Sequence, residues 1–105
     1  MKELESPEYF VAYLNALQKD KELKELLRQV YYTVIDTHSP GMNAKQKEEL
    51  FEDWYSGIDR NYDNVLETLE AYGKTNEFKK ILDKHIPQAK KVINFINKLT
   101  GGEQE

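Results

Sequence analysis

The chain has 105 residues, of which 39% are hydrophobic and 32% are charged, and its formal net charge is -4. A chain of this size buries about two thirds of its unfolded surface, which supplies one hydrophobic core and excludes a multidomain enzyme. Because the sequence has no cysteine, disulfides, thiolate chemistry and cysteine-ligated metals are excluded. We expect a single domain over residues 1–105, ordered over about 6–100 and ending in a disordered tail at 101–105.

The first residues do not resemble a targeting signal. They run Met-Lys-Glu-Leu-Glu, with acidic side chains where a signal or transit peptide would be basic and apolar. No stretch approaches the roughly 20 apolar residues that a membrane span requires. We therefore expect a cytoplasmic protein without a membrane partner.

Two helices are predicted in the first third of the chain. Ser6 followed by Pro7 is a helix start, and apolar residues recur at three- and four-residue spacing over residues 7–18. Asp20 can cap a second helix, so the two should form a helical hairpin. The apolar residues of the second helix are Leu23, Leu26, Leu27, Val30 and Val34.

A loop rich in turn-forming residues is predicted over residues 36–43, followed by one long helix over 44–72. Asn43 and Gln46 have the spacing of a capping box. At 100° per residue a single apolar stripe passes through Phe51 along the whole segment, which favours one continuous helix. Gly57 can introduce a kink inside this helix, and Gly73 is expected to cap its end.

The last helix is predicted over residues 75–100, with Thr75 as its cap. Pro87 interrupts its hydrogen-bond ladder, so we expect this helix to be kinked or split into coaxial pieces at Pro87. The resulting fold class is all-α, a four-helix antiparallel bundle. The residues expected to be largely buried are Leu27, Val30, Trp54, Ile58, Leu69, Ile81 and Ile96.

Residues 59–70 resemble an EF-hand calcium loop. Oxygen-bearing side chains stand at positions 1, 3 and 5, namely Asp59, Asn61 and Asp63, and Glu70 stands at position 12. The resemblance implies a calcium site formed by these four residues. Position 6 is Asn64 where the family has glycine, and a loop would break the apolar stripe. We therefore favour a continuous helix and keep calcium binding as an alternative.

Catalytic chemistry finds little support in the sequence. The histidines, His38 and His85, lack a partner at a spacing typical of a metal or catalytic site. Each serine is explained by a cap, a turn or a helix surface, and no glycine-rich phosphate loop precedes a helix. We expect a protein that is not an enzyme and that has no cofactor.

Charge is distributed unevenly along the chain. Acidic residues of the expected 44–72 helix form one ridge beside its apolar stripe, and lysines form a second ridge on the last helix. These ridges are ordinary solvated faces, surfaces that dock a protein, or a nucleic-acid contact. The acidic ridge comprises Glu49, Glu52, Asp59, Asp63, Glu67 and Glu70, and the basic ridge comprises Lys80, Lys84, Lys91 and Lys98.

Two tyrosines add to the candidate binding surface. Tyr32 lies opposite the apolar stripe of its helix and Tyr9 lies at the edge of the first one, and exposed tyrosines are typical of interfaces. We expect a non-catalytic helical module that binds another protein, either a second copy or a different partner. A calcium-binding protein and a small nucleic-acid-associated regulator are the alternatives. Nucleic acid is disfavoured because the protein is acidic and the basic ridge has no arginine.

Overall fold

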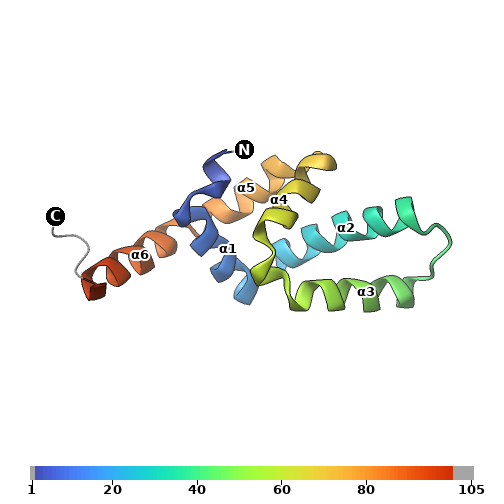
Figure 1. Ribbon diagram of the computed structural model, residues 1–105, viewed down its shortest axis with the longest axis horizontal. Coiled ribbons are helices and arrows are strands. Elements are labelled where there is room, and N and C mark those ends of the chain that lie inside the picture. The colour runs from blue at the N-terminus through green and yellow to red at the C-terminus, as the bar shows by residue number, and fades with distance from the viewer. Residues whose placement is uncertain (1, 101–105) are drawn as a thin grey trace.

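The structure, a computed structural model, describes residues 2–100 (Figure 1). Within that range the regular elements are all helical, so the predicted all-α class is confirmed. The expected disordered tail at 101–105 lies outside the described residues. No helix within that range has both the length and the apolar character of a membrane span.

The helices are more numerous and shorter than the four that the sequence predicts. Residues 2–100 contain six α-helices and two short 3₁₀ helices, so the expected four-helix count is wrong for this range. In chain order the elements are η1 (Lys2–Glu5), α1 (Pro7–Lys19), α2 (Lys21–His38), α3 (Ala44–Ser56), η2 (Ile58–Arg60), α4 (Tyr62–Ala71), α5 (Thr75–Asp83) and α6 (Ile86–Thr100).

Helix starts in the first half of the chain follow the local sequence. The side chain of Ser6 accepts a hydrogen bond from the Tyr9 amide at the start of α1. Asp20 caps α2 in the same manner, through the Glu22 amide at 2.9 Å. At the start of α3, Asn43 and Gln46 exchange both bonds of a capping box.

The expected long helix over residues 44–72 is wrong, because the chain breaks between α3 and α4. Gly57 ends α3, and a single 3₁₀ turn over Ile58–Arg60 leads to Asn61 and the start of α4. The buried Tyr13 hydroxyl donates a 2.7 Å hydrogen bond to the Ile58 carbonyl. In a continuous α-helix that carbonyl would instead accept a hydrogen bond from the backbone amide four residues later. The contact from α1 therefore stabilises the break.

Gly73 caps the end of α4 as expected. Its φ of +72° is a conformation that side-chain-bearing residues rarely adopt. The Lys74 amide donates to the Leu69 carbonyl and the Gly73 amide donates to the Glu70 carbonyl, which is the Schellman arrangement. The expected cap at Thr75 is wrong, because Thr75 is the first residue of α5 and Lys74 precedes it without a side-chain cap.

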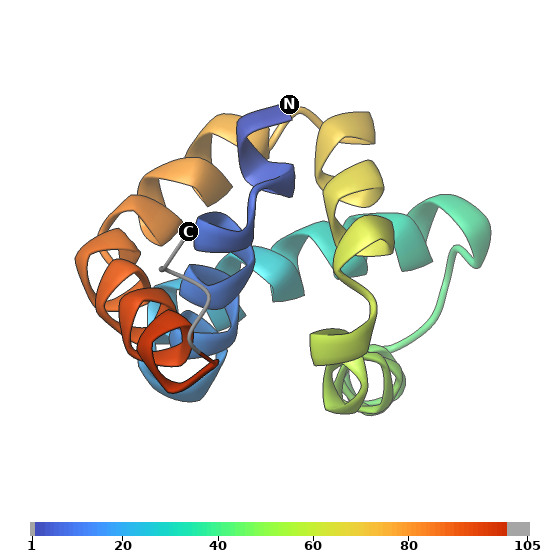
Figure 2. The same cartoon turned by 60° about the vertical axis from the view of Figure 1, so that its left-hand side comes forward.

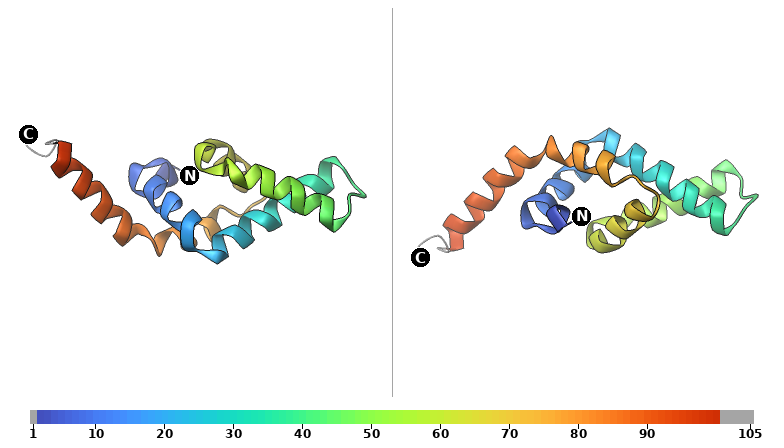
Figure 3. Two further views of the ribbon diagram at one scale, coloured as in Figure 1. Left: turned by 90° about the horizontal axis from the view of Figure 1, so that it is seen from below. Right: turned by 90° about the horizontal axis from the view of Figure 1, so that it is seen from above.

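Of the two outcomes expected for the last helix, the kink at Pro87 is not observed; the helix is split, but the split lies at Lys84 and His85 rather than at Pro87. Pro87 is the second residue of α6. A proline ring clashes with the carbonyl four residues earlier, here that of Asp83, where α5 ends. The break therefore lies one turn before the proline. The chain changes direction there in both panels of Figure 3.

Tyrosine hydroxyls tie neighbouring segments together across the core. Tyr62 donates to the Leu4 carbonyl at 2.6 Å, and Tyr55 donates to the Leu17 carbonyl at 3.3 Å. The ring of Tyr62 also packs against the ring of Tyr13, with centroids 4.7 Å apart. These buried rings hold η1 and α4 against α1, which lies in the middle of the fold (Figure 2).

The core residues expected from the sequence are confirmed in four of seven cases. Trp54 and Ile81 are half-buried at the edge of the core, and Ile96 is 48% exposed. The expected burial of Ile96 is wrong because the second half of α6 extends beyond the rest of the fold (Figure 1). The four buried residues are Leu27, Val30, Ile58 and Leu69.

The molecule is elongated, with extents of 57 × 23 × 19 Å and a radius of gyration of 15.7 Å. A compact chain of this length has a radius of gyration of about 13 Å. The hairpin of α2 and α3 forms one end and α6 forms the other (Figures 1 and 3). This shape does not confirm the expected antiparallel four-helix bundle.

Candidate protein-binding surface

The C-terminal half of α6 exposes apolar side chains. The first turns of α6 are anchored, since Ala89 is fully buried and Ile86 packs against the core. Further along, Phe95 is 61% exposed and Leu99 is 70% exposed. These two residues and the exposed Ile96 form an apolar surface at the end of the molecule, which we call the α6 face.

Lysines border the α6 face. At 100° per residue, Lys91 and Lys98 lie about 40° and 60° from Phe95, on the side away from Ile96. The helix carries one further lysine, Lys90, and no acidic residue. The α6 face therefore combines exposed apolar groups with positive charge.

An acidic groove lies on another side of the molecule, where η1 and the start of α1 run beside η2 and α4. It consists of a cleft of about 740 Å³ and a neighbouring cleft of about 290 Å³. The exposed Pro7 and the 37% exposed Phe10 line the larger cleft, and Leu66 lines the smaller one. Arg60 is the one basic side chain among the lining residues of the two clefts. The acidic side chains are Glu5, Asp59, Asp63, Glu67 and Glu70.

The break between α3 and α4 divides the expected acidic ridge. Glu49 and Glu52 stay on α3, whereas Asp59 lies on η2 and the other three residues lie on α4. The structure therefore brings four of the six residues into the acidic groove and adds Glu5 from η1, which a helical wheel for residues 44–72 cannot include. Those four are Asp59, Asp63, Glu67 and Glu70.

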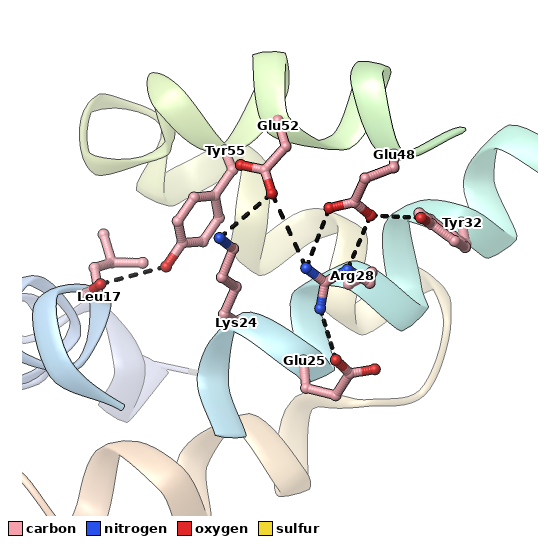
Figure 4. Close-up of polar contacts among 8 residues, drawn as sticks. All are labelled: Leu17, Lys24, Glu25, Arg28, Tyr32, Glu48, Glu52 and Tyr55. Atoms are coloured by element: carbon pink, nitrogen blue, oxygen red, sulfur yellow. Dashed lines mark hydrogen bonds and ion pairs between the residues drawn. The ribbon is translucent and has the colours of Figure 1, made fainter. Parts of the chain in front are cut away.

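Glu52 belongs to a polar cluster between α2 and α3 (Figure 4). Its carboxylate lies 3.3 Å from the Lys24 ammonium. At the centre of the cluster, Arg28 donates two hydrogen bonds to Glu48, at 3.0 Å and 3.2 Å, and a third to Glu25 at 2.6 Å. Helical spacing did not predict this cluster. One signal was present, since Glu48 lies about 60° from Phe51 on the helical wheel, at the edge of the apolar stripe that faces α2.

The pairing in this cluster shifts two ionisation equilibria. Hydrogen bonds from Arg28, and then from Tyr32, lower the pKa of Glu48 from its ordinary 4.5 to about 2. The same contact with Glu48 raises the pKa of Arg28 above its ordinary value. The cluster joins α2 to α3 and each of its charged groups is paired with another member, so we assign it a structural role.

Acid should weaken the fold through Glu48. Because the pKa of Glu48 is lower in the folded chain, the unfolded chain binds more protons between about pH 5 and 2, and acidification favours unfolding. We expect the urea midpoint to fall over this range and Glu48→Gln to reduce the slope. The slope should not vanish, since the pKa values of Asp20 and Asp83 are also lowered. An unchanged slope in Glu48→Gln would contradict the pairing with Arg28.

Both candidate tyrosines are engaged within the fold. Tyr32 is half-buried and donates a 2.5 Å hydrogen bond to Glu48, so its expected exposure is wrong. The Tyr9 hydroxyl donates to Asp83 at 2.5 Å, and the Lys79 ammonium lies over its ring. Neither hydroxyl can donate a hydrogen bond to a partner unless these bonds break.

His85 has partners, contrary to expectation. Its Nε2 lies 2.7 Å from a carboxylate oxygen of Asp20, and its Nδ1 lies 2.9 Å from the side-chain amide of Asn15. Burial favours a higher pKa for Asp20, but hydrogen bonds from His85 and the Glu22 amide and the charge of Lys84 lower it overall. Because both ring nitrogens of His85 are bonded, the group holds the α1–α2 corner against the α5–α6 junction. His38 is the exposed last residue of α2.

The residues of the proposed calcium loop do not form a cluster that resembles a metal site. Asp59 lies on η2, Asn61 precedes α4, and Asp63 and Glu70 lie on α4 itself. Within residues 2–100 no three acidic or histidine side chains are grouped as metal ligands. The objection that a loop would interrupt a continuous helix fails, however, because the chain is interrupted at this point.

The expected basic ridge is divided in the same way as the acidic one. Lys80 lies on α5, Lys84 lies between the helices, and Lys91 and Lys98 lie on α6. Lys84 is paired with Glu22 and lies 3.4 Å from Asp20. Only Lys91 and Lys98 remain aligned on one helix, and they border the α6 face.

Comparison with known proteins provides no family for this chain: no family model matches it, and no curated protein or solved structure is significantly similar to it. Its function is therefore inferred from the surfaces described above.

Proposed function

We propose that this protein is a non-catalytic helical module that acts by binding another protein, and that the α6 face is its binding surface. The observation that carries the proposal is the exposure of Phe95, Ile96 and Leu99 on a helix that extends from the fold. Large apolar side chains grouped at one place and bordered by charge are typical of protein interaction sites. The anchored first turns of α6 hold this surface in position without a partner.

The test replaces the exposed apolar groups and leaves the core intact. Phe95→Ser/Leu99→Ser should not change the unfolding midpoint of the isolated chain, because both residues are exposed. In extracts of the native cells, size-exclusion chromatography should show the wild-type chain in a complex larger than its 12.4 kDa and the double variant at the monomer position.

Leu50→Ser is the matched control. Leu50 is a large apolar residue that is 42% exposed on α3, far along the chain from α6. This variant should stay in the same complex as the wild type. A wild-type chain that elutes as a monomer, or a complex that persists in Phe95→Ser/Leu99→Ser, would refute the α6 face as the binding surface.

A further inference from the structure

Some charged side chains of the described residues have an ion-pair partner within the fold; among those that have none, one set lies on the α6 face and another lies in the acidic groove. Lys24, Lys47, Lys74, Lys79 and Lys84 all lie within ion-pair distance of a carboxylate. Among the described side chains, in contrast, no ion pair is formed by Lys91 or Lys98 or by the five carboxylates of the acidic groove. The two unpaired sets have opposite charge.

Each unpaired set surrounds apolar groups that are at least partly exposed. Lys91 and Lys98 border Phe95 and Leu99 on the α6 face, and the carboxylates surround Pro7, Phe10 and Leu66 in the groove. The groove is a concave surface and the α6 face is a projecting helix. Both surfaces therefore combine apolar groups with unpaired charge, and the two charges are of opposite sign.

We propose that the α6 face of one copy docks in the acidic groove of a second copy. This inference rests on the proposed function and names the partner. Phe95 and Leu99 would contact the apolar lining near Phe10, while Lys91 and Lys98 would face carboxylates such as Glu67 and Glu70. Pairing of α6 with α6 is disfavoured, because each α6 has three lysines and no acidic residue.

Reciprocal exchange is the arrangement that we expect. One helix face covers little of the roughly 1,600 Å² that a stable interface buries in total, and exchange across a two-fold axis forms the contact twice. A closed dimer results, with each α6 in the groove of the other copy. A contact made in one direction only would instead extend into open chains.

Charge reversal tests the inference, because two variants that each dimerise weakly should associate with one another. One variant, Lys91→Glu/Lys98→Glu, reverses the charge of two residues on α6. The other, Glu67→Lys/Glu70→Lys, reverses the charge of two residues in the groove. All four residues are exposed, and positive charge near the end of α4 is favourable for that helix. Sedimentation equilibrium at 0.1 M salt should show a wild-type dimer, with dissociation constants about tenfold or more higher for each variant alone.

An equimolar mixture of the two variants should restore association, because the glutamates of each reversed α6 then face lysines at positions 67 and 70 of the other variant's groove, and each α6 with its own lysines meets an unchanged acidic groove. The chain that carries all four reversals should also dimerise. Glu49→Lys/Asp53→Lys is the control, since it makes the same change of charge at exposed residues of α3 outside the groove. This control variant should dimerise as the wild type does.

Other outcomes would overturn the inference. A purified wild-type chain that stays a monomer at millimolar concentration would exclude self-docking. If its complex in extracts still required Phe95 and Leu99, the proposed function would stand with a different partner. A monomer whose α6 face binds vesicles of anionic phospholipid, with binding lost in Lys91→Glu/Lys98→Glu, would assign the α6 face to a membrane surface. Association unaffected by either reversal would show that the two surfaces do not meet.

Discussion

Leu69→Ala should lower the free energy of unfolding by about 2 to 5 kcal/mol, whereas Ile96→Ala should change it by less than about 0.5 kcal/mol. Leu69 is 1% exposed within the core, so its truncation removes buried apolar surface and leaves a cavity. Ile96 is 48% exposed on the second half of α6, and its side chain already contacts water. Urea unfolding followed by circular dichroism measures both effects.

The pair is informative because the two residues look alike on a helical wheel. Both variants are measured at a concentration at which the chain sediments as a monomer, because a bound partner would cover Ile96. If Ile96→Ala lowered the free energy of unfolding as much as Leu69→Ala does, the second half of α6 would pack against the fold. An unchanged midpoint in Leu69→Ala would place α4 outside the core.

Asp20→Ala should lower the free energy of unfolding by about 2 to 4 kcal/mol, and Asn43→Ala should lower it by only about 1 kcal/mol. Each residue caps a helix, and loss of a cap costs about 0.5 to 2 kcal/mol. Asp20 also accepts the 2.7 Å hydrogen bond from the part-buried His85, and loss of a hydrogen bond to a charged group costs a further 1.5 to 3 kcal/mol or so. The difference in unfolding free energy between the two variants therefore measures the contacts of the Asp20 carboxylate with His85 and Lys84.

Asp20→Ser separates the two roles of Asp20. Serine caps a helix about as well as aspartate, so this variant retains the cap of α2 and loses the carboxylate beside His85. We expect its unfolding free energy to lie between those of the wild type and Asp20→Ala. Equal losses in Asp20→Ala and Asn43→Ala would show that His85 adds nothing to the corner between α1 and α2.

The candidate site was only partly predictable. Acidic residues on α4 and lysines on α6 were identified, because exposed positions follow from helical spacing. Phe95 was not identified, since it falls outside the apolar stripe of its helix and a wheel does not show where the neighbouring elements end. The groove was also beyond the sequence, because Glu5 comes from a segment more than 50 residues before Asp59.

Local sequence by itself determined the all-α class, the starts of α1, α2 and α3, and the end of α4. These features depend on short-range bonds: Ser6, Asp20 and Asn43 reach amides two or three residues away, and Gly73 adopts a positive φ without strain. Such bonds form within one turn of the chain, so the residues next to a helix end determine where that helix starts or stops.

Tertiary structure alone decided where the predicted long helices break and which apolar residues are buried. Both Gly57 and Pro87 marked weak points, but a helix can bend or stop at such residues, and contacts from distant segments select the outcome. The Tyr13 hydroxyl binds the carbonyl of Ile58, and Asp20 and Asn15 hold His85. Because α6 turns away at that second break, Ile96 and Phe95 remain exposed, and burial depends on neighbours that no periodicity within a helix can specify.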